Sequence, residues 1–230
     1  MPGGCRVFYA SVRESDINGS AGAARHAENR SRLAGLLWEH LRAQDTPLWK
    51  NHPIADSTAG PLQIVHDALG CPRLPRGEHA GPSISFSRAG EEIWGALSCD
   101  ESAVGIDVAG CAEFRGDYPV RRAFHAQELE QALNVTGGDV ASAMALLWSV
   151  KEAVVKALGC AFHLVDPLDL QVQHEGVEEG WHVCSVSLSG KALVRYPMEG
   201  RQPISLRSVS QADAWLSIAA VRLPQRPHSG

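Results

Sequence analysis

The sequence predicts an α+β fold, because strand-like and helix-like segments come in separate runs rather than in strict alternation. Three short apolar runs follow one another within residues 83–108, whereas residues 120–158 show helical periodicity. The chain from residue 168 onwards returns to strand-like runs. At 230 residues it is long enough to bury a substantial core as one domain or two.

The first part of the chain opens with a predicted strand at residues 6–12 and a helix at residues 24–43. The helix carries apolar residues on one face. Residues 51–61 are typical of a loop, and residues 62–69 suit either a strand or a short helix. The following strands are expected at residues 83–87, 93–98 and 103–108, the first two joined as a hairpin.

Two helices are expected in the middle of the chain, at residues 120–133 and 139–158, with Gly137 and Gly138 between them. Asp139 suits the N-cap of the second helix, and Gly159 suits the left-handed position after its end. The expected final strands are residues 168–173, 181–188, 192–196, 204–208 and 215–221.

Composition narrows the class of protein. A formal net charge of −5 argues against general nucleic-acid binding. The six cysteines include no CxxC pair and no zinc-like spacing, which predicts reduced thiols. We expect a cytoplasmic protein, because the N-terminus lacks the pattern of a signal peptide and no apolar run reaches the roughly 18–20 residues of a membrane span.

The segment WSVKEAVVKALG at residues 148–159 holds the most informative pattern. On a helix, Trp148, Glu152 and Lys156 recur at i, i+4 and i+8 and form a stripe beside an apolar one. Lys151 lies between the two stripes. From periodicity alone, this is either an ordinary amphipathic helix with a Glu152–Lys156 surface pair or a helix that presents chemistry.

Two other segments carry polar groups in a regular place. GIDV at residues 105–108 is a strand in which Asp107 either presents a carboxylate to a cleft or caps a turn. In SISFS at residues 83–87, alternation places Ser83, Ser85 and Ser87 on one face, where hydroxyls bond phosphate oxygens or face solvent.

Together the three segments resemble the Sfp-type 4′-phosphopantetheinyl transferase family. That family has an (N/S)-x-S-H-S strand, then G-(I/V)-D-(I/V)-E, then W-x-x-K-E-(A/S)-x-x-K-x-x-G. The matching stretches here are SISFS, GIDVA and WSVKEAVVKALG, in the same order. FHAQEL at residues 124–129 is similar to a further family segment, F-F-(S/T)-x-x-E.

The resemblance implies an Mg²⁺-dependent enzyme that moves 4′-phosphopantetheine from coenzyme A to a serine of an acyl or peptidyl carrier protein, releasing adenosine 3′,5′-bisphosphate. Carried over by motif, Asp107 and Glu152 bind the metal, and Glu152 and Lys156 are catalytic. The resemblance also assigns coenzyme A contacts, to Arg30, Ser85, Lys151 and Lys156.

The resemblance implies two similar α+β halves related by a pseudo-two-fold axis. We expect them at residues 1–101 and 102–230, in a monomer with the site between them. One weak internal echo agrees with duplication, since Ser87 precedes Trp94 by the same spacing as Ser208 precedes Trp215.

Three positions depart from the family pattern. The third acidic residue is Ala109, the phosphate-contacting histidine is Phe86, and the lysine of Gly-Lys-Pro is Cys71, with Arg73 and Arg76 close enough in sequence to compensate. These changes keep an alternative open, in which the chain is a catalytically impaired relative that binds coenzyme A or a carrier protein in a regulatory or scaffolding role.

Overall fold

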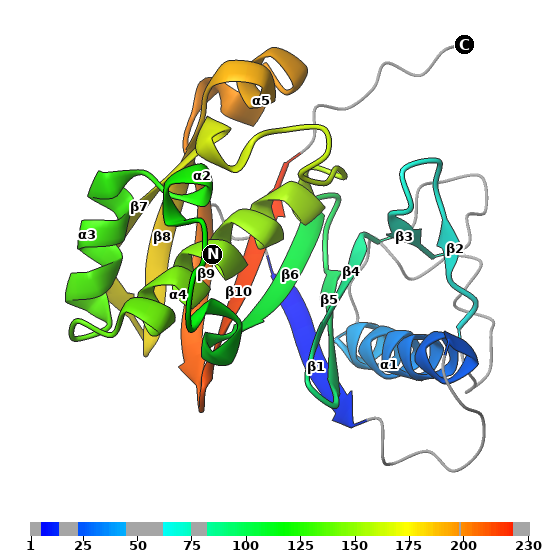
Figure 1. Cartoon of the computed structure of the whole chain (residues 1–230). Helices are drawn as coiled ribbons and strands as arrows, with labels where there is room; N and C mark the ends of the chain where they lie inside the picture. The colour runs from blue at the N-terminus through cyan, green and yellow to red at the C-terminus, as the bar shows by residue number, and fades with distance from the viewer. Residues whose placement is uncertain (1–5, 14–22, 45–61, 75–81, 198, 223–230) are drawn as a thin grey trace.

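The structure is a computed structural model, and it describes residues 6–13, 23–44, 62–74, 82–197 and 199–222. The predicted loop at residues 51–61 and Arg76 lie outside these ranges. The expected α+β class is confirmed, with separate sheets and several helices (Figure 1).

A three-stranded antiparallel sheet forms the N-terminal part. Its strands β1 (Val7–Arg13), β4 (Ile84–Ala89) and β5 (Glu92–Ser98) lie in the order β1-β5-β4. The expected hairpin is confirmed, since β4 and β5 pair directly and Gly90 takes the turn with a φ of 58°. Helix α1 (Ala23–Ala43) packs on β5 and β1 through a stripe of leucines (Figure 1).

A five-stranded antiparallel sheet forms the C-terminal part, in the order β6-β10-β9-β8-β7. The long helix α4 (Val140–Ala157) lies against β6 and β10 and buries most of its residues (Figure 1). The strands are β6 (Ala103–Gly110), β7 (Leu170–Glu178), β8 (Trp181–Leu188), β9 (Ile204–Gln211) and β10 (Ala214–Val221).

The helical middle differs from expectation at one point. A single helix at residues 120–133 was expected, but α2 (Val120–Ala123) and α3 (Ala126–Val135) are separated by Phe124 and His125, both with extended backbone. The cause lies in the capping box of α3, in which the Glu128 carboxylate accepts from the His125 N–H. The N-cap role of Asp139 is confirmed by its bond from the Ser142 N–H, and Gly159 has a φ of 68° as expected.

The predicted strand at residues 192–196 is wrong, because that segment lies in helix α5 (Gly190–Arg195). The carboxylate of Asp169 accepts hydrogen bonds from the N–H groups of Lys191 and Ala192, and these satisfy donors that a helix start leaves open. Residues 62–69 contain only the two-residue strand β2 (Val65–His66), which pairs with β3 (Pro72–Arg73).

The two larger sheets meet edge to edge at β4 and β6. The hydroxyls of Ser83, Ser85 and Ser87 accept hydrogen bonds from the backbone N–H groups of Val104, Ile106 and Val108, at 3.0, 3.2 and 3.1 Å. These serines therefore satisfy edge donors that a neighbouring strand would otherwise take. Apolar side chains of β5, β6 and β10 form a shared core at the same junction.

The strand order hints at related halves without establishing them. In each sheet the first strand of its half pairs with the last, giving β1-β5-β4 and β6-β10-β9. However, Ser87 pairs with Trp94, whereas Ser208 pairs with Ser217, so the sequence echo falls in different registers. The pseudo-two-fold axis and the boundary near residue 101 stay predictions.

Among the helices described, none is long and apolar enough to cross a membrane.

Candidate active site

Strand β6 and helix α4 approach each other closely at Gly105. A Cβ atom at this position would lie 1.9 Å from the Ala153 carbonyl oxygen and 2.6 Å from the Ala157 nitrogen. Only glycine fits such an approach to backbone. Asp107 shares the face of β6 that holds Gly105, because strand side chains alternate, and it therefore points at α4.

The Asp107 carboxylate is held by side chains from two elements, α4 and β4. Lys156 of α4 places its Nζ 2.6 Å from the Asp107 Oδ1 and 3.2 Å from the Ile106 carbonyl oxygen. The Ser87 hydroxyl of β4 donates to the same Oδ1 at 2.8 Å. The carboxylate is 6% exposed as a residue, so its position is fixed largely by these bonds.

Glu152 lies one helical turn before Lys156 on α4. Burial raises the pKa of the Glu152 carboxyl above its ordinary value, Lys156 opposes that shift, and the negative charge of Asp107 adds to it. The charges of Lys156 and Asp107 both act on Glu152, so the three groups lie near one another. Two carboxylates and one ammonium therefore converge between β6 and α4.

Asp107 and Glu152 are two carboxylates that could hold a magnesium ion together with phosphate oxygens and water. Mg²⁺ takes oxygen ligands and usually keeps several waters, often with one or two carboxylates and substrate phosphates. Within the described ranges there is no group of three acidic, histidine or cysteine side chains able to hold a metal. Ala109 shares the face of Asp107 but is 2% exposed and packs in the core, so it contributes no ligand.

A strip of aromatic side chains runs beside Glu152. Trp148 lies 5.0 Å from Phe162 and 6.4 Å from Tyr118, measured between ring centroids, and all three are half-buried. Burial raises the pKa of Tyr118, with smaller contributions from the charges of Glu113 and Glu152. Since the Glu152 charge acts on Tyr118, this aromatic strip lies near the carboxylate.

The predicted ligand residues of the N-terminal part have other neighbours in this structure. The Ser85 hydroxyl is buried and accepts from the Ile106 N–H. The Arg30 guanidinium lies over the Phe86 ring, 5.9 Å from its centroid. The aromatic ring that replaces the family histidine therefore packs beneath the cation that the sequence assigns to the nucleotide.

Buried polar side chains normally have hydrogen-bond partners, and Asn29, next to Arg30, is an exception. Its side chain is 0% exposed, and neither its amide oxygen nor its amide nitrogen has a hydrogen-bond partner among the described residues. Such a group costs about 1–3 kcal/mol of stability. The region that this unpaired amide destabilises is the apolar core between α1 and the three-stranded sheet.

Lys151 is not placed to meet a ligand in this conformation. It is 0% exposed, and its Nζ donates to the Ala123 oxygen at 2.8 Å, the Pro167 oxygen at 2.9 Å and the Glu128 Oε1 at 2.6 Å. These acceptors use all three N–H donors of the ammonium. The predicted contact of Lys151 with coenzyme A finds no support in this geometry.

The position of the missing family lysine lies near the end of α4. Cys71 is half-buried, and burial raises the pKa of its thiol. Arg73 forms an ion pair with Asp67 at 3.1 Å, and a Cβ atom at Gly159 would lie 3.7 Å from its guanidinium. Arg73 is therefore a cation close to the helix that carries Lys156.

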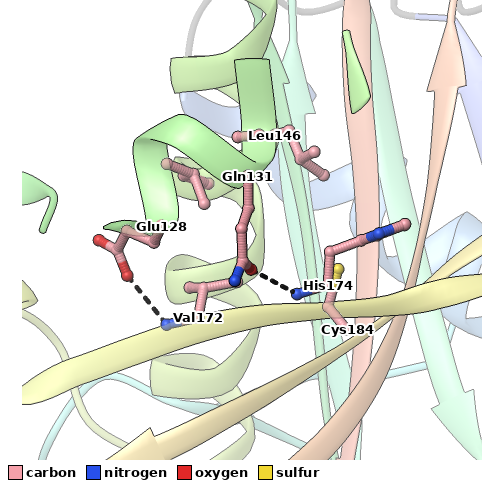
Figure 2. A pocket seen from close by; sticks show the side chains of 8 residues that line it. Glu128, Gln131, Leu146, Val172, His174 and Cys184 are labelled. Atoms are coloured by element: carbon pink, nitrogen blue, oxygen red, sulfur yellow. Dashed lines mark hydrogen bonds between the residues drawn. The ribbon is translucent and has the colours of Figure 1, made fainter. Parts of the chain in front are cut away.

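A small cavity lies on the far side of α3 and α4, between these helices and the sheet (Figure 2). Glu128, Gln131, His174 and Cys184 are among its lining residues. Its volume of about 10 Å³ is near the least that holds one water molecule. It is too small for a substrate.

The part of the chain that carries these residues matches a known protein family. Residues 103–194 match the family model of the 4′-phosphopantetheinyl transferase superfamily. The match covers less than half of the chain, and it contains Asp107, Glu152 and Lys156. The predicted resemblance is therefore confirmed for this region, which supports a transferase. No curated protein matches the chain.

Sequence reasoning missed two residues that shape the site, Glu128 and Ser87. Glu128 binds Lys151, and Ser87 bonds Asp107 directly. The acidic residue of the FHAQEL segment was a usable signal for Glu128, because its spacing from His125 is that of a capping box. Nothing local in the sequence indicates that Ser87 of β4 reaches Asp107 of β6.

Proposed function

We propose that the chain transfers 4′-phosphopantetheine from coenzyme A to a serine of an acyl or peptidyl carrier protein. The observation that carries the proposal is the convergence of Asp107, Glu152 and Lys156 between β6 and α4. It lies inside the region that matches the superfamily. Asp107 and Glu152 are the residues that would hold Mg²⁺, which supplies positive charge to neutralise the pyrophosphate.

The residues divide the remaining work by charge. In the transfer the serine oxygen bonds to the phosphorus next to pantetheine, the phosphoanhydride bond breaks, and adenosine 3′,5′-bisphosphate leaves. Lys156 donates to phosphate oxygens as charge moves to the leaving group. Glu152 is the carboxylate that takes the serine proton in this proposal.

Mass spectrometry tests the proposal directly. Protein, coenzyme A, Mg²⁺ and an apo carrier protein should give a carrier with the added mass of phosphopantetheine. Glu152→Gln should abolish this gain, whereas Lys191→Met, on an exposed side chain of α5, should preserve it. No mass gain with any of several fatty-acid, polyketide and nonribosomal-peptide carriers would contradict the proposal.

A second function is favoured by the altered residues. Phe86 offers no donor to a phosphate, and Ala109 no carboxylate to a metal. A protein that binds coenzyme A or a carrier without transfer would keep its affinity after Mg²⁺ is chelated or Glu152 is replaced. For either function we propose a cytoplasmic protein that is a monomer with halves at residues 1–101 and 102–230. Gel filtration would test the monomer, and expression of the separate halves would test the boundary between them.

A further inference from the structure

We infer that the buried Lys151–Glu128 pair is a positioning device for Glu152, and this inference rests on the proposed metal role of Glu152. The pair has an N–O distance of 2.6 Å, and both side chains are 0% exposed. A buried ion pair often contributes little net stability. A gain in stability therefore does not explain why this pair lies next to Glu152.

Glu128 connects Lys151 to the start of α3 and to strand β7. Its Oε1 accepts from the His125 N–H at 2.9 Å, and its Oε2 accepts from the Val172 N–H of β7 at 2.9 Å. Figure 2 shows the Glu128 side chain reaching from α3 to this backbone group on the strand. These two backbone hydrogen bonds therefore fix the Glu128 carboxylate independently of its bond with Lys151.

Lys151 adds two further restraints of its own. Its ammonium also bonds the carbonyl oxygens of Ala123, in α2, and Pro167, in the 3₁₀ helix η6 (Pro167–Asp169). Three directional bonds at one Nζ fix that atom in position, which an apolar side chain of the same length would not do. One residue of α4 is thus tied to α2, α3 and η6.

The opposite side of α4 is fixed by the glycine approach. Ala153 contacts Gly105 through backbone atoms, and it lies two residues after Lys151. At about 100° per residue these two positions are roughly 200° apart around the helix axis. Glu152 lies between them. Restraints on two nearly opposite sides prevent α4 from turning, and they hold the Glu152 carboxylate toward Asp107.

The consequence is a distinction between folding and function. If the pair merely stabilises the fold, an apolar pair of similar volume should replace it without loss, as such replacements are often neutral or stabilising. If it positions Glu152, the apolar pair should fold normally and still bind metal poorly. Residues that orient metal ligands typically contribute about 10- to 100-fold to affinity or activity.

The test compares the double variant Lys151→Met/Glu128→Leu with the wild-type full chain. Binding of Mn²⁺ alone is measured by calorimetry, thermal unfolding by circular dichroism, and transfer by kcat and KM. Ser149→Ala is the matched control, since it removes a buried polar group of α4 that bonds Ser217 on β10. We expect the double variant to keep its Tm while Mn²⁺ affinity and kcat fall about 10-fold or more and KM changes little.

Each outcome decides the question. A folded double variant with wild-type Mn²⁺ affinity overturns the inference, as does a wild-type chain that binds no Mn²⁺. If the double variant does not fold, Glu128→Gln takes its place, because it keeps the volume and removes only the charge; normal Mn²⁺ binding in that variant overturns the inference. A wild-type chain that binds Mn²⁺ but transfers nothing defeats the proposed transferase and leaves the positioning role intact.

Discussion

Lys156 places its ammonium 2.6 Å from the Asp107 carboxylate, across the packing of α4 on β6. The cation therefore neutralises a carboxylate that the proposed metal site also uses. When coenzyme A binds, its pyrophosphate would compete with Asp107 for the ammonium, and the freed carboxylate would become available to Mg²⁺. In the proposed function, the Lys156–Asp107 ion pair would link substrate binding to metal binding through one side chain.

Lys156→Met should lower kcat/KM for phosphopantetheine transfer by about 10²–10³-fold, because a positioned charge is lost where charge develops. The variant should also unfold at lower temperature, since Asp107 is left buried without its ion-pair partner. Steady-state kinetics and thermal melts measure both effects. Lys191→Met serves as control for loss of a lysine, and equal kcat/KM values for the two variants would remove Lys156 from the mechanism.

Ala109→Glu tests whether the departure from the family motif weakens metal binding. The new side chain would enter a core position on the face of β6 that carries Asp107, so without metal it should cost about 1–3 kcal/mol of stability. A third carboxylate should tighten Mg²⁺ binding, so Mg²⁺ should raise the Tm of this variant more than that of the wild type.

The control for this substitution is Ala112→Glu, which adds the same charge at an exposed position just after β6. Thermal melts with increasing Mg²⁺ compare the two. An equal Mg²⁺-dependent rise in Tm for both variants would mean that position 109 has no access to the metal.

Asn29→Leu should stabilise the protein by about 1–3 kcal/mol, because it replaces a buried amide that has no partner among the described residues with an apolar group of similar size. Denaturant unfolding measures the gain. If this amide also serves a ligand, coenzyme A affinity should fall in the same variant. Leu33→Asn, one turn further along the buried face, is the reciprocal control and should destabilise. A loss of stability in Asn29→Leu would show that the amide is satisfied in solution.

The sequence predicted the elements whose signals are local. The strands at β4, β5 and β6 and the limits of α4 follow from alternation, the Asp139 cap and Gly159. The failures depend on distant partners. Helix α5 starts on the carboxylate of Asp169, which lies in a different segment, and the apolar run at residues 192–196 gives no sign of it. Local periodicity cannot report a cap that arrives from elsewhere in the chain.

The site was predicted in the same uneven way. Asp107, Glu152 and Lys156 came from motif spacing, and the fold brings them together. Lys151 belongs to the same motif, but its side chain points in a different direction and pairs with Glu128. Residues 151 and 152 differ by about 100° around the helix, and only the packing of α3 and η6 determines which direction is buried.

We expect the paired imidazoles of His174 and His182 to make the stability of the protein depend on pH. Their ring nitrogens lie 3.2 Å apart, and His182 also contacts the Trp215 ring edge to face at 5.1 Å. Burial lowers the pKa of His182 below its ordinary value, and the charge of His174 adds to this shift. A histidine whose folded-state pKa is lowered contributes stability above the unfolded value, and that stability is lost as pH falls through the folded value.

The free energy of unfolding should therefore fall as pH is lowered from 7 through about 6 and below, because the unfolded state binds the proton more readily. His182→Phe keeps an aromatic ring against Trp215 and removes the ionisable group, so its stability should change less over this range. Denaturant unfolding at several pH values measures the slope, with the exposed His163→Gln as control. If the slope of His182→Phe equals that of the wild type, the pH dependence arises from other groups and the histidine pair does not govern it.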